Sequence, residues 1–344
     1  MTADAVLGAI RTLAAGQGLS ADQAAGAFDG IMAGEASAAQ VAALLMGLRV
    51  KGETAEEVAG AARALRRAMV VLDADEPESL VDTCGTGGGT VTTFNISTAA
   101  ALLTAGLGVR VAKHGNRSFT SQCGSADVLE ALGVPLDVAP ERMSSVLRAA
   151  GIVFMFAPTM HPAMRHVGPV RRELAIQTVM NVVGPLANPA GAGRQVLGVA
   201  DALRLPLLAG ALASLGTAHA MVVHGVAGLD EISPVGLTRV LEVRNGSVQA
   251  WEIDPAAHGF TSVRPEDLAG GPPARNAAII AEVLGGRGAV AATAAVVLNA
   301  AAALYVGGCV DSYAEGVERA RGGITSGAGL GALERMRVAY TATA

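Results

Sequence analysis

The chain has 344 residues, which is long enough for one large domain and a smaller partner domain. Its apolar fraction of 51% and charged fraction of only 16% supply a sizeable core and exclude an intrinsically disordered chain. The net charge of −5 excludes a general electrostatic attraction to nucleic acid or to anionic lipid.

Two further features bear on where the protein works. The N-terminal residues lack the basic start and long apolar core of a secretion signal, and no uninterrupted apolar run reaches about 18 residues. Cys84, Cys123 and Cys309 lie far apart without C-x-x-C spacing, which argues against a zinc site or a disulfide framework. We therefore expect a cytoplasmic protein with no membrane partner and no nucleic-acid partner.

Helix-start signals dominate residues 1–72. A hydroxyl residue followed three positions later by Glu or Gln forms a capping box, which satisfies free N–H groups at the start of a helix. Because each box precedes an apolar run of helical periodicity, we expect a small all-helical domain. Its alanine- and leucine-rich faces should pack between helices or across a dimer. The boxes are Ser20 with Gln23, Ser37 with Gln40, and Thr54 with Glu57.

The acidic, proline-containing run 73–78 marks the domain boundary. Over residues 79–344, short apolar runs alternate with helical stretches, which is typical of an α/β domain with a mainly parallel sheet and helices on both faces. The segment 161–188 reads as helical and is a candidate to join the N-terminal domain. The predicted strands are 80–84, 109–112, 152–156, 218–224, 238–243 and 248–253, and the predicted helices are 97–105, 125–132, 140–150 and most of the chain from 276.

A glycine-rich run, residues 85–89 (GTGGG), directly follows the first predicted strand, and residues 95–98 (NIST) then open a helix. Glycines let backbone N–H groups approach an anion closely, and a helix start adds unpaired donors, so this combination favours a phosphate site. The run is neither a Walker motif nor a dinucleotide fingerprint. A tight turn followed by a helix cap is the alternative interpretation.

Two more polar runs follow predicted strands. Residues 113–118 (KHGNRS), followed by several hydroxyl residues, suit a polyanion better than a core, although His114 alone could be a structural histidine. Asp230 and Glu231 follow the strand 218–224, and adjacent carboxylates at a strand end can hold Mg²⁺ together with substrate phosphates. A solvated acidic turn is the alternative for this pair.

With these motifs in order, the chain resembles the anthranilate phosphoribosyltransferase family over essentially its whole length. The resemblance implies a small helical domain, a large α/β domain of the nucleoside phosphorylase and phosphoribosyltransferase type, and a homodimer formed through the helical domain. It also implies transfer of a phosphoribosyl group from phosphoribosyl pyrophosphate to anthranilate in tryptophan biosynthesis, with Mg²⁺ as cofactor. The matching runs are GTGG and NIST, KHGNRS, the step 124–127 (GSAD), 156–174, 181–190 and 229–233 (LDEIS).

The resemblance also implies the roles of individual residues, none of them a clear catalytic acid or base. Anthranilate would be contacted by Gly85, Asn116 and Arg171, and Mg²⁺ would be held by Ser97, Asp230 and Glu231. The residues implied for phosphoribosyl pyrophosphate are Gly85, Gly88, Gly89, Thr93, Asn95, Ile96, Ser97, Thr98, Lys113, His114, Gly115, Asn116, Arg117, Ser118, Phe119, Thr120, Ser121 and Ser125.

The chain departs from the family's usual pattern at two places. Position 89 is Gly where the family's glycine loop usually continues with Asp, so one carboxylate beside the loop is absent. Residues 175–178 read AIQT where the family often shows GIRT. Because Arg171 is present, we expect the second departure to change local support and not the identity of the substrate.

Two other functions remain open on the residues. A pyrimidine nucleoside phosphorylase shares the expected architecture and a glycine-rich phosphate loop, but the run 113–117, the Asp230–Glu231 pair and Arg171 favour the transferase. A non-catalytic paralogue that binds nucleic acid is supported by Gly89, and the net charge of −5 without a basic stripe argues against it.

Overall fold

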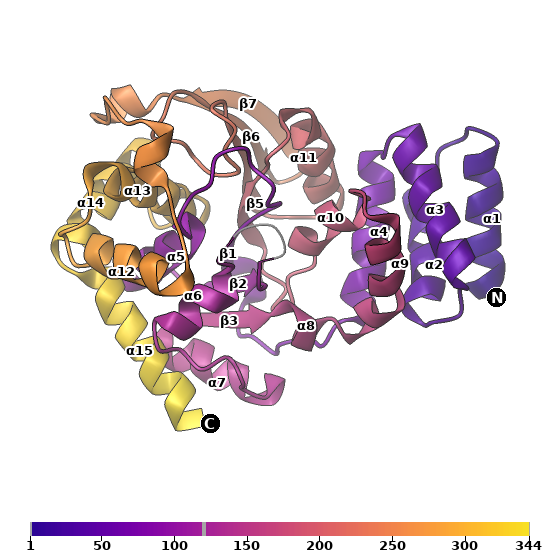
Figure 1. Cartoon of the computed structure of the whole chain (residues 1–344), viewed down its shortest axis with the longest axis horizontal. Coiled ribbons are helices and arrows are strands. Elements are labelled where there is room, and N and C mark those ends of the chain that lie inside the picture. Colours follow the sequence, from indigo (N-terminus) through magenta and orange to yellow (C-terminus); the bar gives the residue numbers. More distant parts are fainter. Residues whose placement is uncertain (1, 119–121, 344) are drawn as a thin grey trace.

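The computed structural model describes residues 2–118 and 122–343. A small bundle of helices at the N-terminal end stands beside a larger body in which helices surround a sheet (Figure 1). This arrangement confirms the expected fold class, a helical domain plus an α/β domain.

The N-terminal bundle consists of four helices, and local sequence fixes the starts of the last three. All three predicted capping boxes are present: the hydroxyl of Ser20, Ser37 or Thr54 accepts the N–H three residues on, and the residue there returns a side-chain bond. The helices are α1 (Thr2–Ala14), α2 (Ala21–Met32), α3 (Ala38–Lys51) and α4 (Ala55–Ala68).

Within this bundle, α2 and α4 pack closely because Gly60 has no side chain. A Cβ at position 60 would lie 2.3 Å from the carbonyl oxygen of Ala21 and 2.8 Å from the Cβ of Ala24. Both values are below ordinary van der Waals contact, so the two helices approach each other at this point only because the residue is glycine.

The α/β body is built on one sheet in the order β3-β2-β1-β4-β5-β6-β7. The first five strands of that order run parallel, and the last two pairings, β5 with β6 and β6 with β7, are antiparallel. The strands are β1 (Val81–Gly85), β2 (Val111–Gly115), β3 (Ile152–Phe156), β4 (Arg194–Gly198), β5 (His219–Gly225), β6 (Thr238–Arg244) and β7 (Ser247–Ile253).

Two strands differ from the sequence prediction. The central strand β4 was not predicted, although it pairs with both β1 and β5. The strand predicted over 109–112 instead spans Val111–Gly115, so Lys113 and His114 lie within the sheet and are buried there. The remaining predicted strands are present within two residues of their expected ends.

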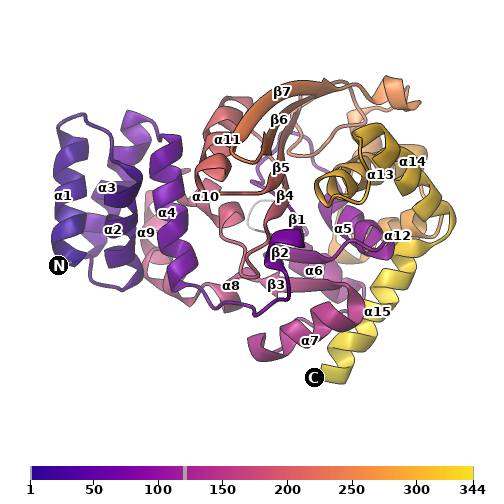
Figure 2. The ribbon, with the colours of Figure 1, turned by 180° about the vertical axis from the view of Figure 1, so that it is seen from behind.

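Helices cover both faces of this sheet (Figure 2). Alternate strand residues point to opposite faces, so Val196 packs with the core around α5 and α13, whereas Leu197 packs with the core around α11 and the N-terminal bundle. The helices of the α/β body are α5 (Ile96–Gly106), α6 (Ser125–Ala131), α7 (Pro140–Ala150), α11 (Leu205–Ser214), α12 (Pro273–Leu284), α13 (Val290–Val306), α14 (Tyr313–Thr325) and α15 (Ala328–Thr343).

The segment 161–188 returns from the sheet to the N-terminal bundle. It forms short helical pieces, with α9 packed against α3 and α10 against α4. Its buried residues Val167, Val182 and Leu186 share one apolar core with α1 to α4. The pieces are η2 (Pro162–His166), α9 (Gly168–Leu174), α10 (Met180–Val183) and η3 (Gly184–Leu186), preceded by α8 (Ala157–Met160).

Of the helices in residues 2–118 and 122–343, none combines the length and the apolar character needed to cross a bilayer.

The substitution Gly60→Ala should lower the free energy of unfolding by about 1–3 kcal/mol, because the added methyl group overpacks the contact between α2 and α4. Urea denaturation measures this change. The matched control is Gly322→Ala in the exposed helical face of α14, where nothing lies within 4 Å of the added Cβ. That control should stabilise the protein by up to about 1 kcal/mol, since alanine is the better helix former; a Gly60→Ala protein as stable as this control would contradict the packing argument.

Candidate active site

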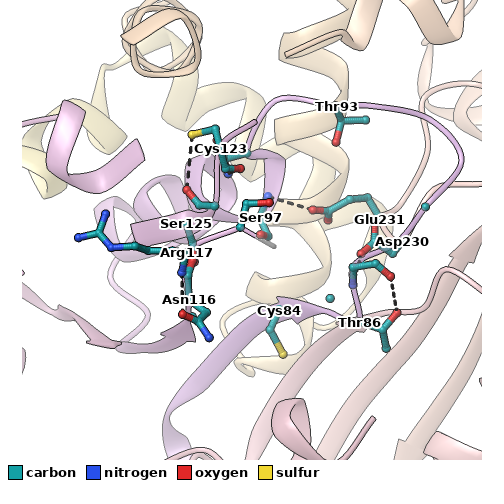
Figure 3. A pocket seen from close by; sticks show the side chains of 18 of the residues that line it. Cys84, Thr86, Thr93, Ser97, Asn116, Arg117, Cys123, Ser125, Asp230 and Glu231 are labelled. Atoms are coloured by element: carbon teal, nitrogen blue, oxygen red, sulfur yellow. Dashed lines mark hydrogen bonds between the residues drawn. The ribbon is translucent and has the colours of Figure 1, made fainter. Parts of the chain in front are cut away.

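A cavity of about 680 Å³ lies at the carboxyl ends of the parallel strands. Strand order reverses between β1 and β4, and ligands of open α/β sheets bind at such a switch point. Figure 3 shows side chains from several loops surrounding this cavity. It is lined by residues 84–89, 91–95, 97, 113–118, 123–125, 177, 181, 230 and 231.

The cavity gathers most of the residues that the sequence singled out. The glycine run, residues 113–118 and the Asp230–Glu231 pair, which are far apart in the chain, all contribute to its wall. Ile96 and Thr98 do not line it, because their side chains are buried in the first turn of α5. Phe119, Thr120 and Ser121 lie outside the described residues.

Arg171 also does not line this cavity. It lies on α9, in the segment that packs against the N-terminal bundle, where burial lowers the pKa of its guanidinium. Among the described residues, no carboxylate lies within ion-pair distance of it. The charge of Arg171 is therefore not compensated by the described part of the protein, which leaves it able to pair with an anionic group.

Two residues of the cavity wall were missed by the sequence analysis. Gln177 and Asn181 come from the segment that packs on the helical bundle, and they line the cavity together with the glycine run. The amide nitrogen of Gln177 lies 3.9 Å from the position that a Cβ on Gly88 would take. The only sequence signal was the unusual AIQT run, which was expected to affect local support alone.

A second, smaller cavity of about 110 Å³ adjoins the first. Thr86, Gly87 and Gly88 border both cavities, as do Gln177 and Asn181. The middle of the glycine run therefore borders both cavities, and the residues that complete the smaller cavity are Val182, Ala200, Asp201 and Arg204.

Asp230 approaches the sheet so closely that two strand ends must be glycine. A Cβ on Gly85 at the end of β1 would lie 2.6 Å from Asp230 Oδ2, and one on Gly198 of β4 would lie 1.7 Å from the Asp230 carbonyl oxygen. Asp230 Oδ2 also accepts the N–H of Gly87 at 2.8 Å. The conformation of the glycine run therefore depends on Asp230.

Positive φ angles add a second reason for glycine in this run. Gly87 and Gly88 have φ of 68° and 83°, a region that residues with a side chain rarely adopt. At Gly89 a Cβ would lie 3.0 Å from the Gly228 carbonyl oxygen and 3.4 Å from Asp230 Oδ1. A carboxylate in place of Gly89 would thus enter the surroundings of Asp230.

The carboxyl groups of Asp230 and Glu231 share a site that favours added positive charge. Burial raises the pKa of Asp230, and burial followed by repulsion from Asp230 raises the pKa of Glu231 to about 8. Glu231 Oε1 accepts the backbone N–H of Ser97 at 3.2 Å, which brings the Ser97 residue next to the pair. Burial makes two adjacent negative charges unfavourable, and a bound divalent cation would compensate both of them.

Two carboxylates are nevertheless few for a metal site in which the protein supplies every ligand. The described residues contain no group of three or more His, Cys, Asp or Glu side chains that could hold a metal ion. Mg²⁺ is commonly held by one or two carboxylates while substrate phosphates and water complete its shell. The residues present therefore fit Mg²⁺ that arrives with a phosphorylated substrate.

Lys113 supplies a buried positive charge beneath the same pair. Its Nζ donates to the carbonyl oxygen of Thr83 and, at 3.3 Å, to Ser97 Oγ. Burial lowers its pKa, while the carboxylates of Asp82 and Glu231 act in the opposite direction. Lys113 thus reaches the floor of the cavity from within β2 and is held there by β1 and α5.

Asp82 fixes the strand that carries Lys113. Burial raises the pKa of Asp82 to about 6, against the favourable influence of Lys113 and of its hydrogen bonds. One carboxylate oxygen accepts the N–H of His114 at 3.1 Å, and the other accepts Asn188 Nδ2 at 2.8 Å. Asn188 is the last residue of the segment 161–188, which packs on the helical bundle, so one buried carboxylate joins β1, β2 and that segment.

His114 has a structural partner, which supports the alternative interpretation given above. Its Nε2 lies 3.2 Å from Nε2 of His161. Burial, then the neighbouring His161 and Lys113, lowers the pKa of His114 to about 3, and burial lowers that of His161 to about 4. Both rings are therefore neutral at pH 7, and His114 contributes a neutral ring to the cavity wall.

Arg117 uses its charge away from the cavity. Its side chain leads away from the residues that surround the open space in Figure 3. The guanidinium bonds to Asp127 at 2.7 Å and to both oxygens of Glu130 at 2.6 and 2.8 Å. Of the two cations in the run 113–118, only Lys113 therefore directs its charge at the cavity.

Comparisons with known proteins agree with this geometry. Residues 77–330 match the family described as "Glycosyl transferase family, a/b domain", and residues 7–69 match "Glycosyl transferase family, helical bundle domain". The anthranilate phosphoribosyltransferase of Rubrobacter xylanophilus is 51% identical over 95% of each chain. That of Pelotomaculum thermopropionicum is 50% identical over 95% of this chain and 94% of its own.

Solved structures of anthranilate phosphoribosyltransferases are similar to this chain as well. The crystal structure of the Thermus thermophilus anthranilate phosphoribosyltransferase superposes with a TM-score of 0.91 at 42% identity, covering 97% of this chain and 99% of the other. The enzyme from Saccharomyces cerevisiae in complex with phosphoribosyl pyrophosphate and Mg gives 0.89 at 28% identity, covering 98% of each chain. The chain described here belongs to the anthranilate phosphoribosyltransferase family.

Proposed function

We propose that the protein transfers the phosphoribosyl group of 5-phosphoribosyl 1-pyrophosphate to the amine of anthranilate, releasing pyrophosphate, in tryptophan biosynthesis. The observation that carries this proposal is the convergence of the glycine run, Lys113 and the Asp230–Glu231 pair on one cavity at the strand switch point. Relatives about half identical over nearly the whole chain support it.

The phosphoribosyl pyrophosphate would lie along the glycine run and the start of α5. Within the glycine run, the N–H groups of Thr86 and Gly87 bond to Gly198 and Asp230, so Gly88 and Gly89 are the donors proposed for its phosphates. The dipole at the start of α5 and the buried charge of Lys113 add positive potential. The proposed contacts are Gly85, Gly88, Gly89, Thr93, Asn95, Ser97, Lys113, Gly115, Asn116, Ser118 and Ser125.

Ser97, Asp230 and Glu231 would hold Mg²⁺ together with the pyrophosphate. When bound, the metal neutralises charge on the pyrophosphate and so makes it a better leaving group. The related enzyme from Saccharomyces cerevisiae is described in complex with phosphoribosyl pyrophosphate and Mg. In this chain, the support is the raised pKa of both carboxyls and the bond from Ser97 N–H to Glu231.

Anthranilate would bind between the two parts of the chain, in contact with Gly85, Asn116 and Arg171. An aromatic amine is a weak nucleophile, so a loose displacement in which the sugar carbon gains positive charge is favoured. The protein's task is then to position the amine and to stabilise charge. No side chain is needed as a base. Arg171 can pair its planar guanidinium with the anthranilate carboxylate, and its place on α9 requires the two parts to approach each other.

The assembly and location of the protein are part of the same proposal. We propose that residues 1–72 with segment 161–188 form one domain and the remainder of residues 79–344 the other. Two copies would associate through the helical domain, where Val50 on α3 is 79% exposed and Leu7 on α1 is 38% exposed. The three cysteines are all free thiols, which fits the reducing cytoplasm.

Purified protein with Mg²⁺ should consume anthranilate only when phosphoribosyl pyrophosphate is present, because both substrates must occupy the cavity. The loss of anthranilate fluorescence measures the reaction. Consumption of thymidine and phosphate instead would support a nucleoside phosphorylase and reject the proposal. Tight binding to single-stranded nucleic acid at moderate salt, without turnover, would support the non-catalytic alternative.

Arg171→Ala should raise the KM for anthranilate about tenfold or more, the effect of losing one charge-assisted hydrogen bond. The KM for phosphoribosyl pyrophosphate should change far less. Steady-state kinetics with each substrate varied in turn measures the two constants. Arg172→Ala, at the exposed neighbouring position on α9, is the matched control and should leave both unchanged. Equal effects of Arg171→Ala on both substrates would remove its proposed role.

Asp230→Asn should weaken Mg²⁺ binding in the presence of phosphoribosyl pyrophosphate by about tenfold or more, because one anionic ligand is lost. The amide keeps an oxygen that can accept the Gly87 N–H, so the fold should persist. Titration calorimetry with Mg²⁺ measures the affinity. Asp201→Asn, whose exposed carboxylate lines only the smaller cavity, serves as control; unchanged Mg²⁺ affinity in Asp230→Asn would contradict the assignment.

A further inference from the structure

We propose that Asp127, which does not line the cavity, is a positioning residue that holds the substrate-facing residues 116–118 in place, with Arg117 as its counter-ion. The inference rests on the proposed function, because residues 116–118 matter only if that wall of the cavity binds substrate. It assigns Arg117 to the support of the site and not to direct contact with phosphate.

The carboxylate of Asp127 bonds to both sides of the turn before α6. Its Oδ2 accepts the N–H of Gly124 at 2.9 Å and the N–H of Ser118 at 3.3 Å. Its Oδ1 accepts Arg117 Nη1 at 2.7 Å. One side chain thus joins residues on either side of positions 119–121, and all three of its partners are among the residues that line the cavity.

The backbone of Asn116 is tied to the same helix start. Its carbonyl oxygen accepts the N–H of Ala126 at 3.2 Å and the hydroxyl of Ser125 at 3.2 Å. Gly124 allows this approach, because a Cβ there would lie 2.4 Å from Ser118 N and 2.6 Å from the Asn116 carbonyl oxygen. Asn116 and Ser125 therefore keep a fixed relation to the first turn of α6, and Figure 3 shows both beside the cavity.

Charge explains why Asp127 needs Arg117. Asp127 is the better shielded member of the pair, with a side chain 19% exposed against 47% for Arg117. A bare carboxylate behind this wall would repel a pyrophosphate, and the adjacent guanidinium compensates it. Burial tends to raise the pKa of Asp127, but the Gly124 N–H and Arg117 together lower it, so it stays ionised at neutral pH.

Glu130 is a natural reference for this role. It bonds the same guanidinium, but among the described residues it accepts no N–H of the turn, and its side chain is 42% exposed. An exposed ion pair of this kind contributes little, whereas charge-assisted bonds to backbone N–H groups fix geometry. Substituting Glu130 therefore removes only an ion pair, whereas substituting Asp127 also removes the bonds that hold the turn in position.

The test measures binding of phosphoribosyl pyrophosphate with Mg²⁺ by calorimetry, and the steady-state constants, for the full chain. Asp127→Ala should raise the Kd and KM for phosphoribosyl pyrophosphate about tenfold or more, because the acceptor of the Gly124 and Ser118 N–H groups is lost. Asp127→Asn keeps an oxygen for the Gly124 N–H and should recover most of that loss. Glu130→Gln should match the wild type.

Asp127→Glu is the second variant, and it tests the same role if Asp127→Ala does not fold. Its longer side chain keeps the charge but displaces the carboxylate from the two N–H groups, so binding should still weaken. Wild-type binding by Asp127→Glu, or a lowered melting temperature with unchanged Kd and KM in Asp127→Ala, would show a merely structural role and overturn the inference while the proposed function stands. Failure of the wild type to bind phosphoribosyl pyrophosphate would overturn both.

Discussion

The approach of Asp230 to the ends of β1 and β4 is the constraint on which the site depends. Its carbonyl oxygen and carboxylate occupy the space that side chains at positions 198 and 85 would fill. The same carboxylate bonds to Gly87 and so sets the course of the glycine run. The contact between Asp230 and the strand ends therefore positions both the carboxylate suited to a metal and the loop suited to phosphate.

Buried charge gives the site its second constraint. Lys113 lies close enough to Asp82 and to Glu231 to influence the pKa of both, and each of the three buried charges would be unfavourable alone. Asp82 ties this group to Asn188 and hence to the segment that packs on the helical bundle. The polar floor of the cavity and the joint between the two parts of the chain are thus one hydrogen-bonded unit.

Features that depend on neighbours in the sequence were predictable. The capping boxes involve residues three positions apart, and the hairpin of β6 and β7 turns at Asn245 and Gly246, where φ is positive. The central strand β4 was missed because Arg194 and Gln195 begin it and only a short apolar stretch follows. Its identity as a strand depends on β1 and β5, which are distant in the sequence.

The residues of the candidate site also fall into two groups, those that the sequence could predict and those that depend on distant packing. The glycine run, Lys113 and the Asp230–Glu231 pair could be found because each lies near or after the carboxyl end of a strand, and the sheet brings strand ends together. Gln177 and Asn181 could not, since their place in the wall depends on how segment 161–188 packs. The partners of Arg117 were equally hidden, because its position in a polar motif gives no sign of the carboxylates on α6.

The strand order has a consequence for how the protein is made. Val81 of β1 pairs with Arg194 of β4, and the Asp230 contact closes over both strand ends. During synthesis from the N-terminus, the glycine run emerges long before the residues that fix its shape. The helical bundle has mostly local contacts, but it also shares its core with α11 and the segment 161–188. The region of the site should therefore be among the last parts of the molecule to acquire its native structure, since contacts between distant residues form slowly.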